Sequence, residues 1–199
     1  MTVRLVLVAH AATEATRQAR FPADDVSLDP NGTAAAVAAN GALRRITTAC
    51  RGPEERCRRT AAALGLDAVT DPALADLDIG AWRGTTLTEL EADHSADLFA
   101  WLTDPDATPH GGESLTGLLA RVARWLNELP TGTARIAAIT HPAVVRAAVL
   151  HVLGAPAAGF WRLDAAPLSQ TWLTHHGGRW QLRETGHPLT PAVAVPHPE

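Results

Sequence analysis

The sequence predicts a single α/β domain, a three-layer sandwich in which a mostly parallel central sheet lies between helices on both faces. Residues 3–8 and 134–139 are continuous apolar runs rich in β-branched side chains, as in strands buried on both faces of a sheet. Segments with helical composition or spacing alternate with these runs. A chain of 199 residues can bury a sizeable core without disulfides or a structural metal.

The first half of the chain reads as strands separated by helices. After the strand at 3–8, a turn-like segment at 29–32 precedes a helix at 34–43. A short strand at 46–49 follows, and Pro53 then opens a helix to about residue 64, at the position where proline removes no backbone hydrogen bond. This pattern predicts strand, helix, strand, helix in the order a parallel sheet requires.

The middle of the chain departs from this alternation. After a short strand at 68–70, a loop containing Gly80 and Gly84 leads to two helices, one before and one after Ser95. We expect residues 84–113 to form an excursion over the active-site face of the sheet.

The alternation resumes in the second half. A helix at 114–129 has Ser114 as its N-cap and a helical apolar stripe, namely Leu115, Leu118, Leu119, Val122, Trp125, Leu126 and Leu129. The strand at 134–139 is followed by a helix at 142–153 that Gly154 closes. Strands at 159–163 and 170–174 and a hairpin through Gly177-Gly178 complete the fold.

We therefore expect one domain over residues 1–186. Residues 187–199 form a Pro-rich tail that we expect to be poorly ordered.

Composition limits the classes of partner. The formal net charge of -4 and the pI near 6.1 provide no basic field for nucleic acid. The apolar N-terminal run is too short to span a membrane and no cleavage site follows it, so we expect a cytoplasmic protein that binds no membrane. Cys50 and Cys57 fit neither a disulfide framework nor a zinc cluster, and the histidines show no metal-site spacing. The expected partner is a small-molecule substrate.

Two predicted strands end in histidine. His10 follows the first strand and His141 follows the strand at 134–139, so parallel neighbours would bring both imidazoles to one edge of the sheet. The backbone N–H groups that open the helix after His141 favour an anion there, and Arg56 could add a guanidinium. Each histidine could instead be a satisfied polar residue at a strand end, and Arg56 could be solvated beside Arg58 and Arg59.

Motif-like segments occur in a fixed order along the chain. Residues 7–13 are similar to a strand end with the motif Arg-His-Gly, residues 25–32 to D-x-P-L-T-x-x-G, and residues 53–61 to S-P-x-x-R-A-x-x-T-A. Residues 74–84 are similar to L-x-E-x-D-F-G-x-W-E-G, residues 111–114 match G-G-E-S, and residues 140–146 are similar to T-H-G-G-V-I-R. In order and spacing this series resembles the histidine phosphatase (phosphoglycerate mutase-like) superfamily over roughly residues 3–185.

The resemblance implies roles for four side chains. His10 would be the nucleophile that takes the phosphoryl group, His141 the second imidazole, Arg56 a phosphate clamp and Asp76 the proton donor to the leaving alcohol. An unprotonated imidazole is a competent nucleophile, and a carboxyl group needs a raised pKa to donate a proton. No metal or organic cofactor is implied.

Four other residues complete the predicted substrate-binding set around the catalytic residues. They are Thr13, Thr16, Trp82 and Arg83.

The chain departs from the family pattern at this site. Ala9 stands where the resemblance expects an arginine, and losing a preorganised donor of this kind typically costs a hundred- to a thousandfold in rate. The neighbourhood holds further departures, at Ala11, Ala12, Thr16, Pro142 and the short Asp76. Arg83, Arg17 or Arg20 could supply a replacement charge, or all three could be solvated.

Three functions remain open. The first is hydrolysis of a small phosphomonoester through phospho-His10, in a weakened or remodelled pocket. The second uses His10, His141 and Asp76 for acid–base chemistry on a non-phosphorylated substrate: elimination, isomerisation or hydrolysis. The third is a catalytically silent binding protein. A late exposed strand could pair two copies into a homodimer.

Overall fold

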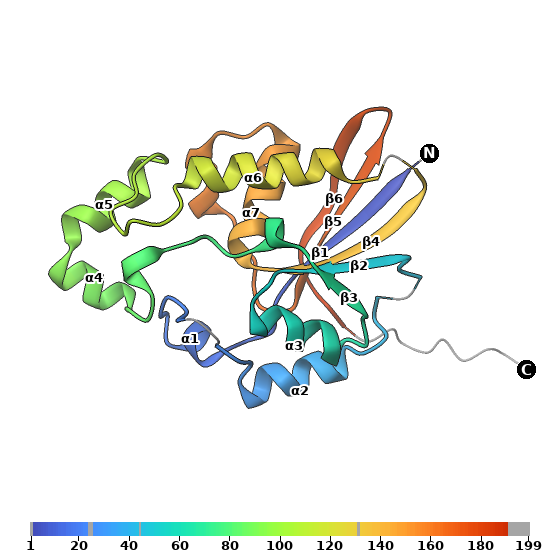
Figure 1. The fold of residues 1–199 in the computed structure, drawn as a ribbon, viewed down its shortest axis with the longest axis horizontal. Helices are drawn as coiled ribbons and strands as arrows, with labels where there is room; N and C mark the ends of the chain where they lie inside the picture. Colours follow the sequence, from blue (N-terminus) through green and yellow to red (C-terminus); the bar gives the residue numbers. More distant parts are fainter. Residues whose placement is uncertain (1, 24–25, 44, 131, 191–199) are drawn as a thin grey trace, which may run out of the picture.

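A six-stranded sheet forms the middle layer of the computed structural model, which describes residues 2–23, 26–43, 45–130 and 132–190. The strand order is β3-β2-β4-β1-β5-β6 (Figure 1). The strands are β1 (Val3–Ala9), β2 (Thr48–Arg51), β3 (Ala68–Thr70), β4 (Ala134–Thr140), β5 (Ser169–His176) and β6 (Arg179–Pro188). The first four run parallel, whereas β5 and β6 each pair antiparallel with the preceding strand in this order. The predicted fold class is confirmed.

Strand β1 separates two apolar cores because its successive side chains point to opposite faces. Leu5 and Leu7 join the core beneath the later helices, while Val6 and Val8 join a smaller core on the other face. All four are fully buried. This explains why the run at 3–8 shows no alternation of apolar and polar residues.

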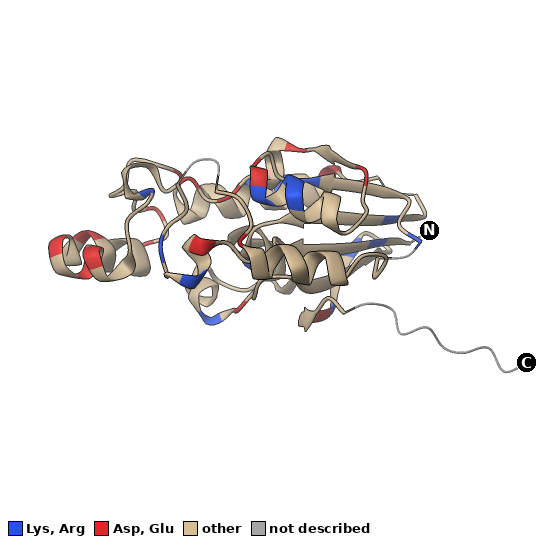
Figure 2. Ribbon diagram, turned by 90° about the horizontal axis from the view of Figure 1, so that it is seen from below, with Lys and Arg blue, Asp and Glu red and all other residues tan. Residues whose placement is uncertain are grey.

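Helices cover both faces (Figure 1). Helices α2 (Pro30–Ala38) and α3 (Glu55–Ala63) pack on one face, and α6 (Leu115–Glu128) and α7 (Pro142–Leu153) pack on the other. A short helix α1 (Glu14–Arg17) follows β1. The helices α4 (Leu87–Asp93) and α5 (Ser95–Thr103) extend beyond the sheet and carry a cluster of acidic side chains (Figure 2).

Several predicted boundaries differ from the structure. The segment 159–163, predicted as a strand, lies in the 3-10 helix η3 (Ala157–Arg162), so that prediction is wrong. Helix α2 begins at Pro30, because the Asp29 side chain accepts a hydrogen bond from the Gly32 N–H and caps the helix. The second strand lies two residues later than predicted.

The C-terminal boundary also differs from the sequence-based expectation. Strand β6 continues through His187 and Pro188, which pair with Gln170 and Ser169, so the segment predicted as a tail begins inside the sheet. Residues 191–199 lie outside the described residues. No described helix has the length and apolar character needed to cross a membrane.

Candidate active site

The ends of β1 and β4 bring two histidines together. The two strands pair in parallel with Ala9 opposite Thr140, so His10 and His141 both leave the sheet at the same edge. The His10 N–H donates to the Thr140 carbonyl at 2.8 Å, and the two imidazole centroids lie 5.2 Å apart. The parallel register therefore produces the pairing that the sequence predicted.

His10 is held as a neutral base. Its Nδ1 lies 2.8 Å from the Ala11 carbonyl oxygen, which can only accept, so Nδ1 carries the proton and Nε2 keeps its lone pair. Burial, together with the charges of His141 and Arg56, lowers the pKa of His10 to about 3. The imidazole is therefore unprotonated throughout the neutral range.

His141 has the opposite electrostatic environment. Its Nε2 lies 2.7 Å from a Glu54 carboxylate oxygen, and its Nδ1 lies 3.3 Å from Asp76 Oδ2. Burial alone would lower the pKa of His141, but the Asp76 carboxylate and, after it, Cys57 outweigh burial and raise the pKa well above its ordinary value. A charged His141 thus donates through Nε2 to Glu54, lies within ion-pair distance of Asp76, and stands beside the neutral His10.

Asp76 lies between the two cations of the site. Its Oδ2 accepts from Arg56 at 2.8 Å and contacts His141. Burial would raise the pKa of this carboxyl group, but His141 and Arg56 together hold it far below its ordinary range. In the unliganded site Asp76 is therefore a carboxylate, although the expected proton-donor role requires a protonated acid.

The segment that carries Asp76 is fixed by Arg121 of α6. Arg121 pairs with Glu113 through two hydrogen bonds of 2.6 and 2.9 Å, and it also donates to the carbonyls of Ala73, Ala75 and Asp76. Glu113 belongs to the segment that resembles G-G-E-S. This segment therefore acts through Arg121, which it orients against the Asp76 backbone.

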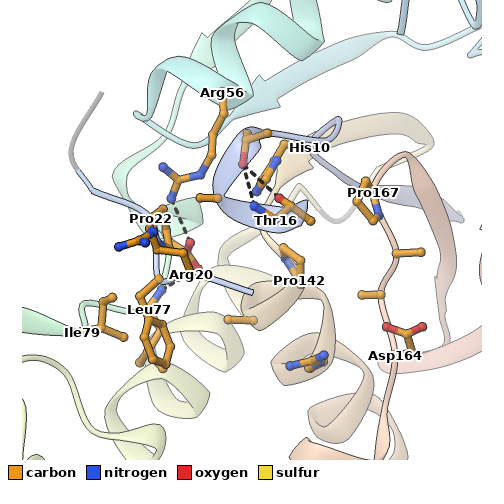
Figure 3. A pocket seen from close by; sticks show the side chains of 18 of the residues that line it. His10, Thr16, Arg20, Pro22, Arg56, Leu77, Ile79, Pro142, Asp164 and Pro167 are labelled. Atoms are coloured by element: carbon orange, nitrogen blue, oxygen red, sulfur yellow. Dashed lines mark hydrogen bonds and ion pairs between the residues drawn. The ribbon is translucent and has the colours of Figure 1, made fainter. Parts of the chain in front are cut away.

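A cavity of about 350 Å³ opens beside His10. Figure 3 shows Arg56 and Leu77 on one side of it and Asp164 and Pro167 on the other, with Pro142 between them. Its volume falls in the range of small-molecule sites. Its cationic lining residues are Arg20, Arg56 and Arg146, and its aromatic lining residues are Phe21, Trp101, Phe160 and Trp161.

The predicted substrate-binding residues divide into two groups. Thr13 and Thr16 line the cavity, with their hydroxyl oxygens 3.0 Å apart. Trp82 does not line it: this side chain packs behind the wall against Phe21 and Trp101. Arg83 pairs with Asp78 at 2.7 Å and lines a neighbouring hollow instead.

The three arginines considered as replacements for the charge missing at Ala9 also differ. Arg17 pairs with Glu14 and Asp29 and lies outside the cavity lining, as Arg83 does. Arg20 lines the cavity and donates to the Gly84 carbonyl. Of the three, Arg20 is the one that contributes charge to the cavity.

Sequence reasoning missed Glu54 and left Arg146 without a role. Glu54 sits in the segment that resembles S-P-x-x-R, at a position the motif leaves open, so no pattern singled it out. A Cβ at Gly52 would lie 2.9 Å from the Glu54 carboxylate and 3.0 Å from His141 Nε2, so glycine makes the room that Glu54 fills. Arg146 ends the last motif, and its position one helical turn after Pro142 was the available signal.

The described residues include one group with the geometry of a metal site, Glu54, Cys57 and His141. Cys57 Sγ lies 3.3 Å from His141 Nε2, the same nitrogen that contacts Glu54. A metal bound here would need that nitrogen as a lone-pair donor, whereas the two carboxylates around His141 favour its protonated form. The group is therefore better described as part of the hydrogen-bonding shell of His141.

Comparisons with known proteins agree with this architecture. A bifunctional protein of Mycobacterium tuberculosis is 34% identical over 179 residues, which cover 83% of this chain and 49% of that protein. The chain thus spans about half the length of the first curated relatives it matches. Glucosyl-3-phosphoglycerate phosphatase of Mycobacterium tuberculosis is 29% identical over 133 residues, covering 63% of this chain and 60% of the relative.

Solved structures show the same fold. The native structure of mycobacterial glucosyl-3-phosphoglycerate phosphatase superposes with a TM-score of 0.80 at 28% identity, covering 92% of this chain and 97% of that one. The alpha-ribazole phosphatase of Shigella flexneri, at 20% identity, has a TM-score of 0.81 and covers 96% and 98% of the two chains. The family model of the histidine phosphatase superfamily (branch 1) matches residues 5–187. The chain belongs to the histidine phosphatase superfamily.

Proposed function

We propose that this protein hydrolyses a small phosphomonoester through a phosphohistidine at His10. The observation that carries the proposal is the pairing of a neutral imidazole, His10, which lines the cavity, with a charged one, His141, whose ring centroid is 5.2 Å away. The neutral ring has the lone pair that attacks phosphorus, and the positive charge of His141 beside it stabilises the negative charge of the phosphoryl group.

The first step transfers the phosphoryl group to the protein. The lone pair of His10 Nε2 forms a bond to phosphorus while the bond from phosphorus to the ester oxygen breaks. The leaving oxygen takes a proton from the Asp76 carboxyl group and departs as the alcohol. In the second step water adds to phosphorus, the P–N bond breaks, and Asp76 regains its proton from that water, which restores neutral His10 and releases inorganic phosphate.

Asp76 must gain a proton before the first step. In the unliganded site His141 and Arg56 keep it ionised. A phosphate dianion binding at the same cations competes for their N–H groups and adds negative charge beside the carboxylate, and both effects raise the pKa of Asp76. Substrate binding itself therefore supports the protonation that the mechanism needs.

The lining of the cavity favours a phosphorylated substrate over the non-phosphorylated alternative. That alternative rested on a pocket with little positive charge, because Ala9 supplies no guanidinium. Arg20, Arg56 and Arg146 nevertheless all line the cavity, and the charged His141 lies 5.2 Å from His10, which lines it too. An anion is the ligand that such a cavity stabilises. A cytoplasmic location, expected from the sequence, stays part of this proposal.

The test is phosphate release from a panel of phosphomonoesters, p-nitrophenyl phosphate included, between pH 5 and 8. We expect turnover by the native chain that His10→Ala abolishes, at a rate lowered by the alanine at position 9. A native chain that releases no more phosphate than the His10→Ala variant from every ester would contradict the proposal.

A further inference from the structure

The proposed nucleophile depends on which nitrogen of His10 carries the proton. The pKa of His10 is about 3, so its ring holds a single proton in the neutral range. Attack on phosphorus needs the lone pair of Nε2, so this proton must stay on Nδ1. A neutral histidine in water favours the other tautomer, with the proton on Nε2. The fold must therefore hold an acceptor against Nδ1, and the Ala11 carbonyl oxygen, 2.8 Å away, is that acceptor.

The backbone that supplies this acceptor is held by Thr60 of α3. The Ala11 N–H donates to Thr60 Oγ1 at 3.0 Å, and the Thr60 hydroxyl donates to the Arg56 carbonyl at 2.7 Å. The hydroxyl has one proton, which the Arg56 carbonyl accepts, so its lone pairs remain for Ala11. Ala11 and Thr60 are both fully buried. An Ala11 N–H without this acceptor would therefore be a costly buried donor.

These contacts form one chain from α3 to the imidazole. Thr60 holds the peptide that joins His10 to Ala11, and the carbonyl that accepts from Nδ1 belongs to the next peptide. Only the two soft dihedral angles of Ala11 separate these groups. On the other side of the imidazole, the His10 N–H donates to the Thr140 carbonyl at 2.8 Å. Loss of the Thr60 bond would let the Ala11 backbone turn, which moves the acceptor away from Nδ1.

Helix α3 also carries a guanidinium of the site. Arg56 and Thr60 are four residues apart, so they share one face of the helix. Arg56 lines the cavity, and its guanidinium donates to Asp76 at 2.8 Å. Thr60 therefore ties the backbone beside His10 to the helix that places a cation at the cavity.

We propose that Thr60 is a positioning residue, whose hydroxyl holds the Ala11 backbone so that His10 keeps its proton on Nδ1 and its lone pair on Nε2. This inference rests on the proposed function and adds the side chain that keeps the nucleophile in its reactive form. Thr60 lies outside the lining of the cavity, so it acts on the rate of phosphoryl transfer and not on the binding of substrate.

Nitrogen NMR of the isotopically labelled protein measures the tautomer directly, because protonated and unprotonated imidazole nitrogens differ widely in chemical shift. The His10 signals are those that disappear in His10→Ala. At neutral pH we expect a protonated Nδ1 and an unprotonated Nε2 in the native chain. Thr60→Val keeps the shape of the side chain without its hydroxyl, and both shifts should move towards the other tautomer. Thr60→Ser keeps the hydroxyl and should retain the native shifts.

Thr171→Val is the matched control. Thr171 is a buried threonine of β5 whose hydroxyl oxygen lies 2.9 Å from that of Thr185, and neither residue lines the cavity. We expect native His10 shifts in this variant. With an alkyl phosphate, Thr60→Val should lower kcat by about 10- to 100-fold with KM unchanged, because the nucleophile is misplaced while the cavity is intact. Thr171→Val should leave both constants near their native values.

The outcomes separate the role of Thr60 from the proposed function. Native His10 shifts in Thr60→Val overturn the inference, and so does an equal change in Thr171→Val, which would indicate general loosening of the fold. A raised KM with unchanged kcat in Thr60→Val overturns it as well.

A second pair of variants decides if Thr60→Val does not fold. Thr60→Ser and Thr60→Ala differ only in the hydroxyl, so the same His10 shifts in both would contradict the proposed role. Absence of phosphate release by the native chain would instead contradict the proposed function, while the NMR shifts would still decide the role of Thr60.

Discussion

Two carboxylates contact the ring nitrogens of His141. Asp76 contacts its Nδ1, and Glu54 contacts its Nε2 at 2.7 Å. Glu54 also accepts the Asp76 backbone N–H at 3.0 Å, so it holds both the imidazole and the residue assigned as proton donor. The burial of His141 makes these contacts strong, because few water molecules compete for its N–H groups. In the proposed mechanism Glu54 is a positioning residue and Asp76 is the proton donor.

Replacing Asp76 with asparagine should slow different esters unequally. An alkyl phosphate needs a proton on its leaving oxygen, so we expect its kcat to fall by about 10²- to 10⁴-fold. The first step with p-nitrophenyl phosphate needs no such proton, because the nitrophenolate is a good leaving group, so its initial burst should be nearly unaffected. Rapid-mixing kinetics on both esters make the comparison, and equal slowing of the first step would contradict the proton-donor role.

Replacing Glu54 with glutamine should move the alkaline limb of kcat/KM. His141 Nε2 lies 2.7 Å from the Glu54 carboxylate, and this contact with His141 lowers the pKa of Glu54 against the effect of burial. The same contact favours the protonated imidazole, so removing the carboxylate makes His141 lose its proton at a lower pH. We expect the alkaline decline to shift downward in a profile from pH 5 to 9. A limb that stays in place, with only an overall loss of rate, would indicate that Glu54 is purely structural.

At the scale of elements, the site depends on a loop crossing. The segment from Asp78 to Gly80 packs against the segment from His110 to Gly112, and a Cβ at Gly112 would overlap the Asp78 carbonyl. The Ala81 N–H donates to the His110 carbonyl at 2.9 Å, and the Glu113 N–H donates to the Asp78 carbonyl at 2.7 Å. This crossing therefore fixes the loop that begins at Asp76.

Gly112→Ala should destabilise the fold. The added methyl group meets backbone rather than a flexible side chain, so the crossing must open, at a cost of about 1–3 kcal/mol in the free energy of unfolding. Gly132→Ala is the control: nothing lies within 4 Å of the added methyl group, and we expect a change within about 0.5 kcal/mol. Urea denaturation measures both, and equal effects would contradict the importance of the crossing.

The elements themselves were partly predictable. Strands β1 and β4 were recognisable from their continuous apolar runs, and the histidines that follow them could be placed at one sheet edge by parallel pairing alone. The segment 159–163 was not, because its apolar residues suit a strand equally well. Its 3-10 form depends on packing, since Phe160 is buried and contacts Trp161 and Arg146.

The cavity was harder to predict than the pairing of His10 with His141. Trp101 and Trp161 meet at 4.5 Å across sixty positions of sequence and form one wall, which no local sequence pattern indicates. Likewise, Asp76 was expected to be a ready proton donor, but the charges that surround it are visible only once Arg56 and His141 converge. Periodicity and spacing describe neighbours along the chain, whereas these contacts join residues far apart in the sequence.

At the scale of the whole molecule, burial of a neutral His10 links stability to pH. The pKa of His10 is about 3 in the folded protein and near 6.5 in the unfolded chain, so the unfolded state binds more protons between these values. Stability should therefore fall as pH falls, by about 2 kcal/mol between pH 6.5 and 5. The raised pKa of His141 also stabilises the folded protein, and this stabilisation is complete below pH 6.5. His141 therefore causes no loss of stability as the pH falls from 6.5 to 5.

Urea unfolding at several pH values tests this linkage. The native chain should lose stability over this interval, and His10→Ala should lose about 2 kcal/mol less, because it lacks the group that the fold keeps unprotonated. Equal slopes for the two proteins would contradict a buried neutral His10.

Detection of the phosphohistidine intermediate tests the proposed mechanism most directly. In Asp76→Asn, p-nitrophenyl phosphate should still phosphorylate His10, whereas hydrolysis of the intermediate should be slow because the base that activates water is missing. After an alkaline quench, peptide mass spectrometry should find one phosphoryl group on the peptide that contains His10, and none in the His10→Ala, Asp76→Asn double variant. Release of nitrophenol with no phosphoryl group on His10 would contradict the central claim.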